Sequence, residues 1–187
     1  MSSSSGTTGS PTYSGFTLQD REITNDNQAR ALVRLGIEPG DVVMHASVLS
    51  MWIAGIPGVD SMMAYGVCLV PVGALSGVER VAQIARDTRP KSIKCTVSFA
   101  QHLAKHMEQR TGIDPATLGL EKVVVFGEPG GSIPEIYEPL EKKFWRRDGT
   151  RHHGCNRLPQ PDRHFLRRAQ RHSFLCRGQR DVRDLRT

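Results

Sequence analysis

The sequence predicts an α/β protein in which helices flank a parallel sheet. Four short runs rich in apolar residues recur within the first 145 residues, at 42–44, 67–72, 93–97 and 123–126. Stretches with a helical spacing of apolar residues separate these runs. Buried parallel strands carry nearly continuous apolar residues and are joined by helical crossovers, so the alternation predicts a sheet covered on both faces.

Two helices are expected around the first strand. Thr17 and Asp20 have the spacing of a capping box, and the amphipathic stretch behind them ends at Gly36. Residues 52–65 are small and apolar, and they predict a second helix that is broken near Pro57.

Helical signals also follow the second, third and fourth strands. Ser76 and Glu79 again have capping-box spacing, Ser98 is an expected N-cap, and a short turn of helix should begin at Asp114. These signals predict helices over residues 76–88, 98–110 and 134–144.

Ligands of open parallel sheets bind beyond the carboxyl ends of the strands. Three segments of this chain leave strands at that edge, namely 46–55, 96–98 and 127–131. We expect them to form the walls of a pocket.

The charge divides the chain into two parts. Residues 1–145 hold 13 basic and 15 acidic residues, whereas residues 146–187 hold 12 arginines and four aspartates. The net charge of +6 therefore comes from the second part alone. We expect a domain over 1–145 and an irregular, Arg-rich tail over 146–187, and a nucleic-acid-binding function would rest on this tail.

Cysteine usage and hydropathy indicate a cytoplasmic protein. The four cysteines are scattered without a C-x-x-C pair, which is typical of reduced thiols. The sequence has no apolar run of 18 residues and no basic-then-apolar leader, so neither a membrane span nor a signal peptide is expected.

Glycines alternate with hydroxyl residues between Ser4 and Thr12. Such a loop offers backbone N–H and hydroxyl donors to a polyphosphate. It is not a Walker A loop, because both the spacing and the lysine are missing. A flexible terminus is the alternative, but the strand-like alternation from Thr12 to Thr17 favours an ordered loop.

The order Ser-Ser-Gly-Thr-Thr-Gly-x-Pro-Thr resembles the phosphate-binding loop of the adenylate-forming acyl-CoA synthetases, and the continuation through Gly15-Phe16-Thr17 is similar to their phenylacetate–CoA ligase branch. The resemblance continues to about Phe144 and implies a partial adenylate-forming N-terminal domain. It also implies that the ATP phosphates are bound by Ser5, Gly6, Thr7, Thr8, Gly9, Ser10 and Thr12.

The turn after the fourth strand carries a second element of the resemblance. Gly127, Glu128 and Pro129 resemble the G-E-P segment that lines the adenosine site in these ligases. A plain strand-to-helix turn with Ser132 as N-cap is the alternative.

The acyl pocket of the family corresponds to the region between Ala46 and Tyr65 of this chain. The resemblance implies that Trp52, Ile56 and Met62 line a slot for an aromatic or hydrophobic acid, while core packing is the alternative for each of them. Residues 96–98 resemble a Thr-x-Ser-Tyr segment of the family, with Phe99 in place of the tyrosine.

The chemistry implied by the resemblance is the activation of an aryl or other carboxylic acid. ATP converts the acid to an acyl-adenylate, CoA receives the acyl group, and Mg²⁺ bridges the phosphates near Thr7 or Thr8. A homodimer is a further implication, and neither a membrane nor a nucleic acid is an expected partner.

The tail after Phe144 departs from the family pattern. A frameshift in a GC-rich gene would explain its arginine content, and a remnant without function is a further alternative. The region before the loop, the Mg-binding glutamate segment and the C-terminal lid of the family have no counterpart in this chain. We therefore expect little or no ligase activity from the chain alone.

Overall fold

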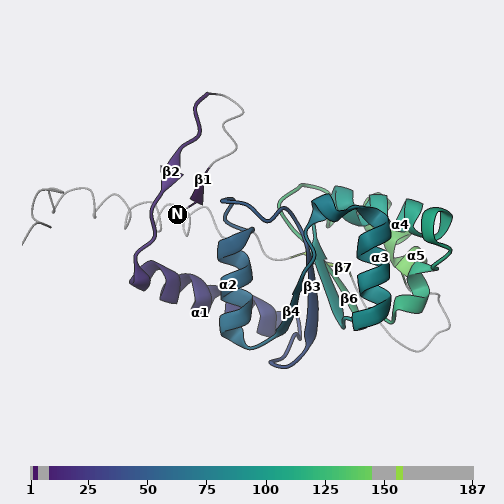
Figure 1. Ribbon diagram of the computed structural model, residues 1–187, viewed down its shortest axis with the longest axis horizontal. Helices are drawn as coiled ribbons and strands as arrows, with labels where there is room; N and C mark the ends of the chain where they lie inside the picture. The colour runs from purple at the N-terminus through teal and green to yellow at the C-terminus, as the bar shows by residue number, and fades with distance from the viewer. Residues whose placement is uncertain (1, 4–8, 145–154, 158–187) are drawn as a thin grey trace, which may run out of the picture.

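The computed structural model describes residues 2–3, 9–144 and 155–157. Their main feature is a parallel sheet with helices on both faces (Figure 1). Its strands are β3 (Val42–Ala46), β4 (Cys68–Pro71), β5 (Ser92–Cys95), β6 (Lys122–Val125) and β7 (Cys155–Arg157), arranged in the order β4-β3-β5-β6-β7. The predicted α/β class and parallel sheet are confirmed.

The register aligns the carboxyl ends of the three central strands. Ala46 of β3 lies opposite Cys95 of β5, and Cys95 lies opposite Val125 of β6. The segments that follow these strands therefore leave the sheet side by side, as the sequence predicts.

The helices divide between the two faces of the sheet (Figure 1). On one face lie α1 (Leu18–Arg34) and α2 (Ile56–Tyr65). The other face is covered by α3 (Gly77–Thr88), α4 (Val97–Thr111) and α5 (Pro134–Phe144). Two short 3₁₀ turns, η1 (Ala74–Ser76) and η2 (Pro115–Leu118), complete the connections.

Each face of the sheet buries its own apolar cluster. The larger cluster packs α3, α4 and α5 against strand residues such as Met44, Ile93 and Val123. The smaller cluster lies beneath α1 and α2 and contains Leu32, Leu35, Ile37, Val43, Met62, Val67 and Val124. Burial of these side chains on both faces is the main stabilising contribution.

The expected helix caps are partly confirmed. Thr17 and Asp20 form the predicted capping box, in which each backbone N–H donates to the other side chain. The capping box expected at Ser76 is wrong, because its hydroxyl donates to the Val72 carbonyl oxygen instead. Ser98 is not the N-cap of α4 as expected, because this position is taken by Thr96, whose hydroxyl accepts a hydrogen bond from the Phe99 N–H.

The break expected in the second helix is wrong as well. Pro57 lies in the first turn of α2, where its missing N–H costs no helical hydrogen bond. The proline therefore lies in the first turn of the helix instead of interrupting it.

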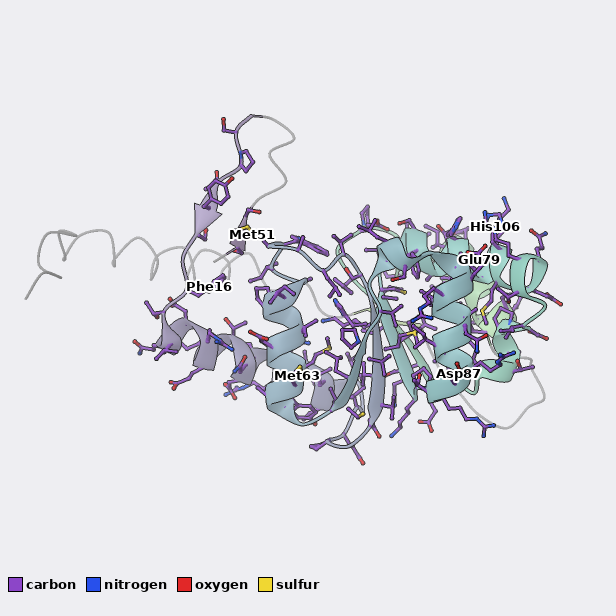
Figure 2. All side chains as sticks on the ribbon, viewed as in Figure 1. Phe16, Met51, Met63, Glu79, Asp87 and His106 are labelled. Atoms are coloured by element: carbon purple, nitrogen blue, oxygen red, sulfur yellow. The ribbon has the colours of Figure 1, made fainter. Side chains whose placement is uncertain are left out.

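The two short strands on either side of the glycine- and hydroxyl-rich loop form the arms of a small hairpin. β1 (Ser2–Ser3) pairs antiparallel with β2 (Tyr13–Ser14), and the two strands stand away from the sheet (Figure 1). The Ser3 N–H donates to the Met51 carbonyl oxygen at 3.0 Å, which joins the hairpin to the loop before α2. Met51 lies near the base of the hairpin in Figure 2.

The structure describes only a small part of the Arg-rich tail. Within the Arg-rich tail the structure describes Cys155–Arg157 alone, which add β7 beside β6. The rest of the tail lies outside the described residues.

None of the helices in the described part of the chain is long and apolar enough to cross a bilayer.

We predict that Leu103→Ala lowers the free energy of unfolding by about 2–5 kcal/mol, because it leaves a cavity in the larger cluster. The matched control is Leu75→Ala, since Leu75 is 89% exposed, and its effect should stay within about 0.5 kcal/mol. Urea unfolding measures both. Equal effects of the two substitutions would contradict the burial described here.

Candidate functional site

An open hollow of about 470 Å³ lies at the carboxyl ends of the parallel strands. The segments after β3, β5 and β6 all contribute to it, which confirms the predicted pocket walls. It is lined by Ser47, Val48, Trp52, Ala74, Thr96, Ser98, Phe99, His102 and Glu128.

Glu128 is held against the start of α4. Its two carboxylate oxygens accept hydrogen bonds from the Ser98 N–H and the Ser98 hydroxyl, both at 2.8 Å. The first N–H groups of a helix lack partners within the helix and favour a negative charge. The predicted adenosine turn is therefore fastened to the strand-to-helix corner of the neighbouring βα unit.

Gly127 allows Trp52 to approach this turn. Its φ is +79°, and a Cβ atom at this position would lie 2.9 Å from Cη2 of Trp52. The indole ring also stacks on Phe126, with ring centroids 5.7 Å apart. Trp52, which is predicted for the acyl pocket, thus contacts Gly127, which is predicted for the adenosine site, and Phe126, which precedes it in the chain.

The other predicted pocket residues lie elsewhere. Ile56 begins α2 and is 51% exposed. Met62 is fully buried within the smaller cluster, which agrees with the alternative that it packs in the core. Neither borders the hollow. Pro129 is exposed on the turn beyond Glu128.

The predicted phosphate loop is described only in part. Ser5, Gly6, Thr7 and Thr8 lie outside the described residues. Gly9, Ser10 and Thr12 are exposed on the hairpin. The sequence prediction of phosphate contacts therefore stays a prediction.

The described residues do not form a metal centre. No three His, Cys, Asp or Glu side chains of the described chain lie together in a metal-binding arrangement. His102 and His106 are neighbours on α4, with ring centroids 4.6 Å apart, and have no third ligand. The Mg²⁺ site expected near Thr7 and Thr8 lies outside the described residues, so it stays a prediction.

A buried lysine behind the aromatic pair was missed by sequence reasoning. Lys94 on β5 is only 3% exposed, and its Nζ lies 4.9 Å from the centroid of the Phe126 ring. No carboxylate of the described chain pairs with it. Burial lowers the pKa of Lys94 from its ordinary value of 10.5 to about 8, so the side chain is still charged at pH 7.

His45 lies beside Lys94, because the two residues are register partners on β3 and β5. Its ring is fully buried and lies nearly parallel to Phe126. Burial, and next the charge of Lys94, lower the pKa of His45 to about 4. The backbone of Ala54 acts in the opposite direction and raises this pKa, although it does not reach hydrogen-bond geometry. Because the resulting pKa is about 4, the ring is neutral at pH 7.

Several buried polar atoms on this face have no partner. Both ring nitrogens of His45 and the hydroxyls of Ser47 and Ser92 make no hydrogen bond within the described chain. Most buried polar groups in folded proteins are paired, since an unpaired one costs about 1–3 kcal/mol. A signal for this cluster was available in the period-two placement of polar residues at 45, 47, 92 and 94.

Comparison with known proteins found no matching family model. The phenylacetate-coenzyme A ligase of Thermus thermophilus is 36% identical over 126 residues, which are 67% of this chain and 28% of that protein. The phenylacetate-coenzyme A ligase of Pseudomonas putida is 31% identical over 144 residues, which are 77% of this chain and 32% of that protein. The chain thus spans less than a third of these curated relatives.

Solved structures share the fold. A 2-hydroxyisobutyryl-CoA ligase in complex with 2-HIB-AMP and CoA has a TM-score of 0.70 at 29% identity, over 76% of this chain and 30% of that chain. O-succinylbenzoate coenzyme A synthetase from Bacillus subtilis, in complex with AMP, has a TM-score of 0.53 at 18% identity, over 77% of this chain and 34% of that chain. The second likeness shows the fold alone.

We predict that Gly127→Ala destabilises the protein through two effects, backbone strain at a positive φ and displacement of Trp52. Gly119→Ala is the matched control, because Gly119 has a φ of +70° and open space around its Cα. The Gly127 variant should lose about 1–2 kcal/mol more in urea unfolding. This excess should vanish in a Trp52→Ala background, and an excess that persists would contradict the contact.

We predict that Lys94→Met stabilises the protein at pH 7. The lowered pKa means that the charged ammonium lowers the free energy of unfolding. This penalty is about 3 kcal/mol and is fully present below pH 8. The penalty disappears as the pH rises through 10.5, so the variant's advantage in free energy of unfolding should shrink over that window. Lys105→Met, at an exposed position, should show no such trend. A pH-independent difference at Lys94 would refute this reasoning.

Proposed function

Because this chain belongs to the phenylacetate–CoA ligase branch of the adenylate-forming enzymes, we propose that it carries the acid- and nucleotide-binding face of an acid–CoA ligase. In the proposed reaction the carboxylate of the acid attacks the α-phosphate of ATP and expels pyrophosphate. The thiol of CoA then attacks the acyl carbon and expels AMP. The acid is an aryl or hydrophobic carboxylic acid.

One observation carries this proposal, namely that Trp52 lies against Gly127 beside the hollow. The resemblance assigns these residues to different ligands, Trp52 to the acid and Gly127 to adenosine. An acyl-adenylate joins both ligands in one molecule, so the two sites must adjoin. Their contact at the carboxyl edge of the sheet supports an acyl-adenylate site.

The residues of the hollow have distinct proposed tasks. Trp52, which stacks on Phe126 behind it, offers aromatic surface on which a planar ring gains stacking and apolar contact. Ser98 holds Glu128 and thereby fixes the turn that faces the adenosine. Gly9, Ser10 and Thr12 would meet the phosphates from the hairpin, and Mg²⁺ bound with ATP would neutralise phosphate charge near Thr7 and Thr8.

The relatives carry this region within longer proteins, since the match covers 28% of the Thermus protein. We therefore expect the 187-residue chain to bind an acyl-adenylate without forming acyl-CoA. Acyl-CoA production by the purified chain from ATP, CoA and phenylacetate would contradict this part of the proposal.

The test uses a non-hydrolysable mimic, phenylacetyl sulfamoyl adenosine, in isothermal titration calorimetry. We predict binding by the wild-type chain and at least a tenfold loss for Glu128→Ala, because the Ser98–Glu128 bonds that hold the turn are removed. Glu22→Ala, at an exposed position on α1, should bind like the wild type. Absence of binding by the folded wild-type chain would overturn the proposed function.

A further inference from the structure

Among the described residues, Lys94 is the one lysine, arginine, aspartate or glutamate that is buried. It is nearly excluded from water, and no described carboxylate accepts a hydrogen bond or ion pair from it. Its contact with Phe126 offers up to about 2 kcal/mol, which is less than the several kcal/mol that dehydration of an ion costs. A bound anion would supply the missing compensation.

Neighbouring groups also suit an anion. The neutral ring of His45 has an N–H without a partner, and the Ser47 hydroxyl has none within the described chain. Ser47 also borders the hollow. These donors surround the same end of β3 and β5, so a ligand reaching Lys94 from the hollow would find hydrogen-bond donors along its route.

Gly58 leaves room above the ammonium. It lies in α2 and is buried, and its φ is not in the left-handed region. The backbone therefore does not require glycine, although glycine within a helix costs about 1 kcal/mol relative to alanine. A Cβ here would lie 4.0 Å from Lys94 Nζ and 3.5 Å from the Ile53 carbonyl oxygen, which are ordinary contact distances, so a space the size of a methyl group is open above the ammonium.

A thin aromatic layer separates this cluster from the hollow. Phe126 contacts both Lys94 and Trp52, and Trp52 lines the hollow. An aryl ring seated beside these two rings would direct its far substituent toward the lysine. The carboxylate that becomes activated would stay in the hollow near Glu128.

We propose that Lys94, together with His45, forms a subsite for a second carboxylate, so that the substrate is an aryl acid with carboxylates at both ends. This inference rests on the proposed function and narrows its substrate class. Lys94 is a specificity-determining residue in this scheme, since it binds the group that does not react.

The experiment compares two sulfamoyl adenosine mimics, one of phenylacetate and one of 4-carboxyphenylacetate, by calorimetry at pH 7. The wild-type chain should bind the carboxylated mimic at least tenfold more tightly, which is the gain typical of a charge-assisted hydrogen bond. Lys94→Met should abolish this preference, because the two mimics differ only in the carboxylate that Lys94 would bind. Lys105→Met should keep the preference.

Gly58→Ala supplies a second test, because its added methyl group reduces the space above Lys94 Nζ without removing the charge. It should lower the preference for the carboxylated mimic several-fold. Equal binding of both mimics by the wild-type chain, or a preference that survives Lys94→Met, would overturn the subsite and leave the proposed function standing. Failure of the wild-type chain to bind either mimic would overturn both.

Discussion

The alignment of three parallel strands is the constraint on which the rest of the molecule depends. Ala46, Cys95 and Val125 lie in one row, so the chain leaves β3, β5 and β6 at a common edge. The apolar clusters on both faces stabilise this register, because a shift of one residue would turn buried side chains toward the wrong face. Trp52, Ser98 and Glu128 meet only because the register holds.

The two faces of the sheet serve different purposes near this edge. Met44, Ala46, Ile93 and Cys95 point into the larger cluster, which is apolar throughout. The alternate positions, at 45, 47, 92 and 94, are polar and buried on the face that α1 and α2 cover. A sheet can hold such a division because successive side chains alternate between faces. Of these four polar residues, Ser47 borders the hollow.

Much of this architecture was predictable from the chain. The apolar runs predicted four strands to within about two residues, and the parallel arrangement then predicted which loops meet. The Ser98–Glu128 bonds were not predictable, since they join residues from different βα units. The sequence could not show whether Met62 lines a pocket or packs in the core, because a methionine on an apolar helix gives the same sequence pattern in both cases. Lys94 was overlooked because a single lysine within a short strand resembles an exposed edge position.

The unequal clusters also have a consequence for motion. The layer of α1 and α2 rests on seven buried residues and covers the unpaired groups of His45, Ser47 and Ser92, whereas the opposite layer rests on a cluster of nineteen. Local opening follows the regions with least burial. Amide hydrogens of α1 and α2 should therefore exchange before those of α3 and α4. Such partial opening would admit water to Lys94 while the remainder of the sheet stays folded, and a ligand bound there would slow the exchange.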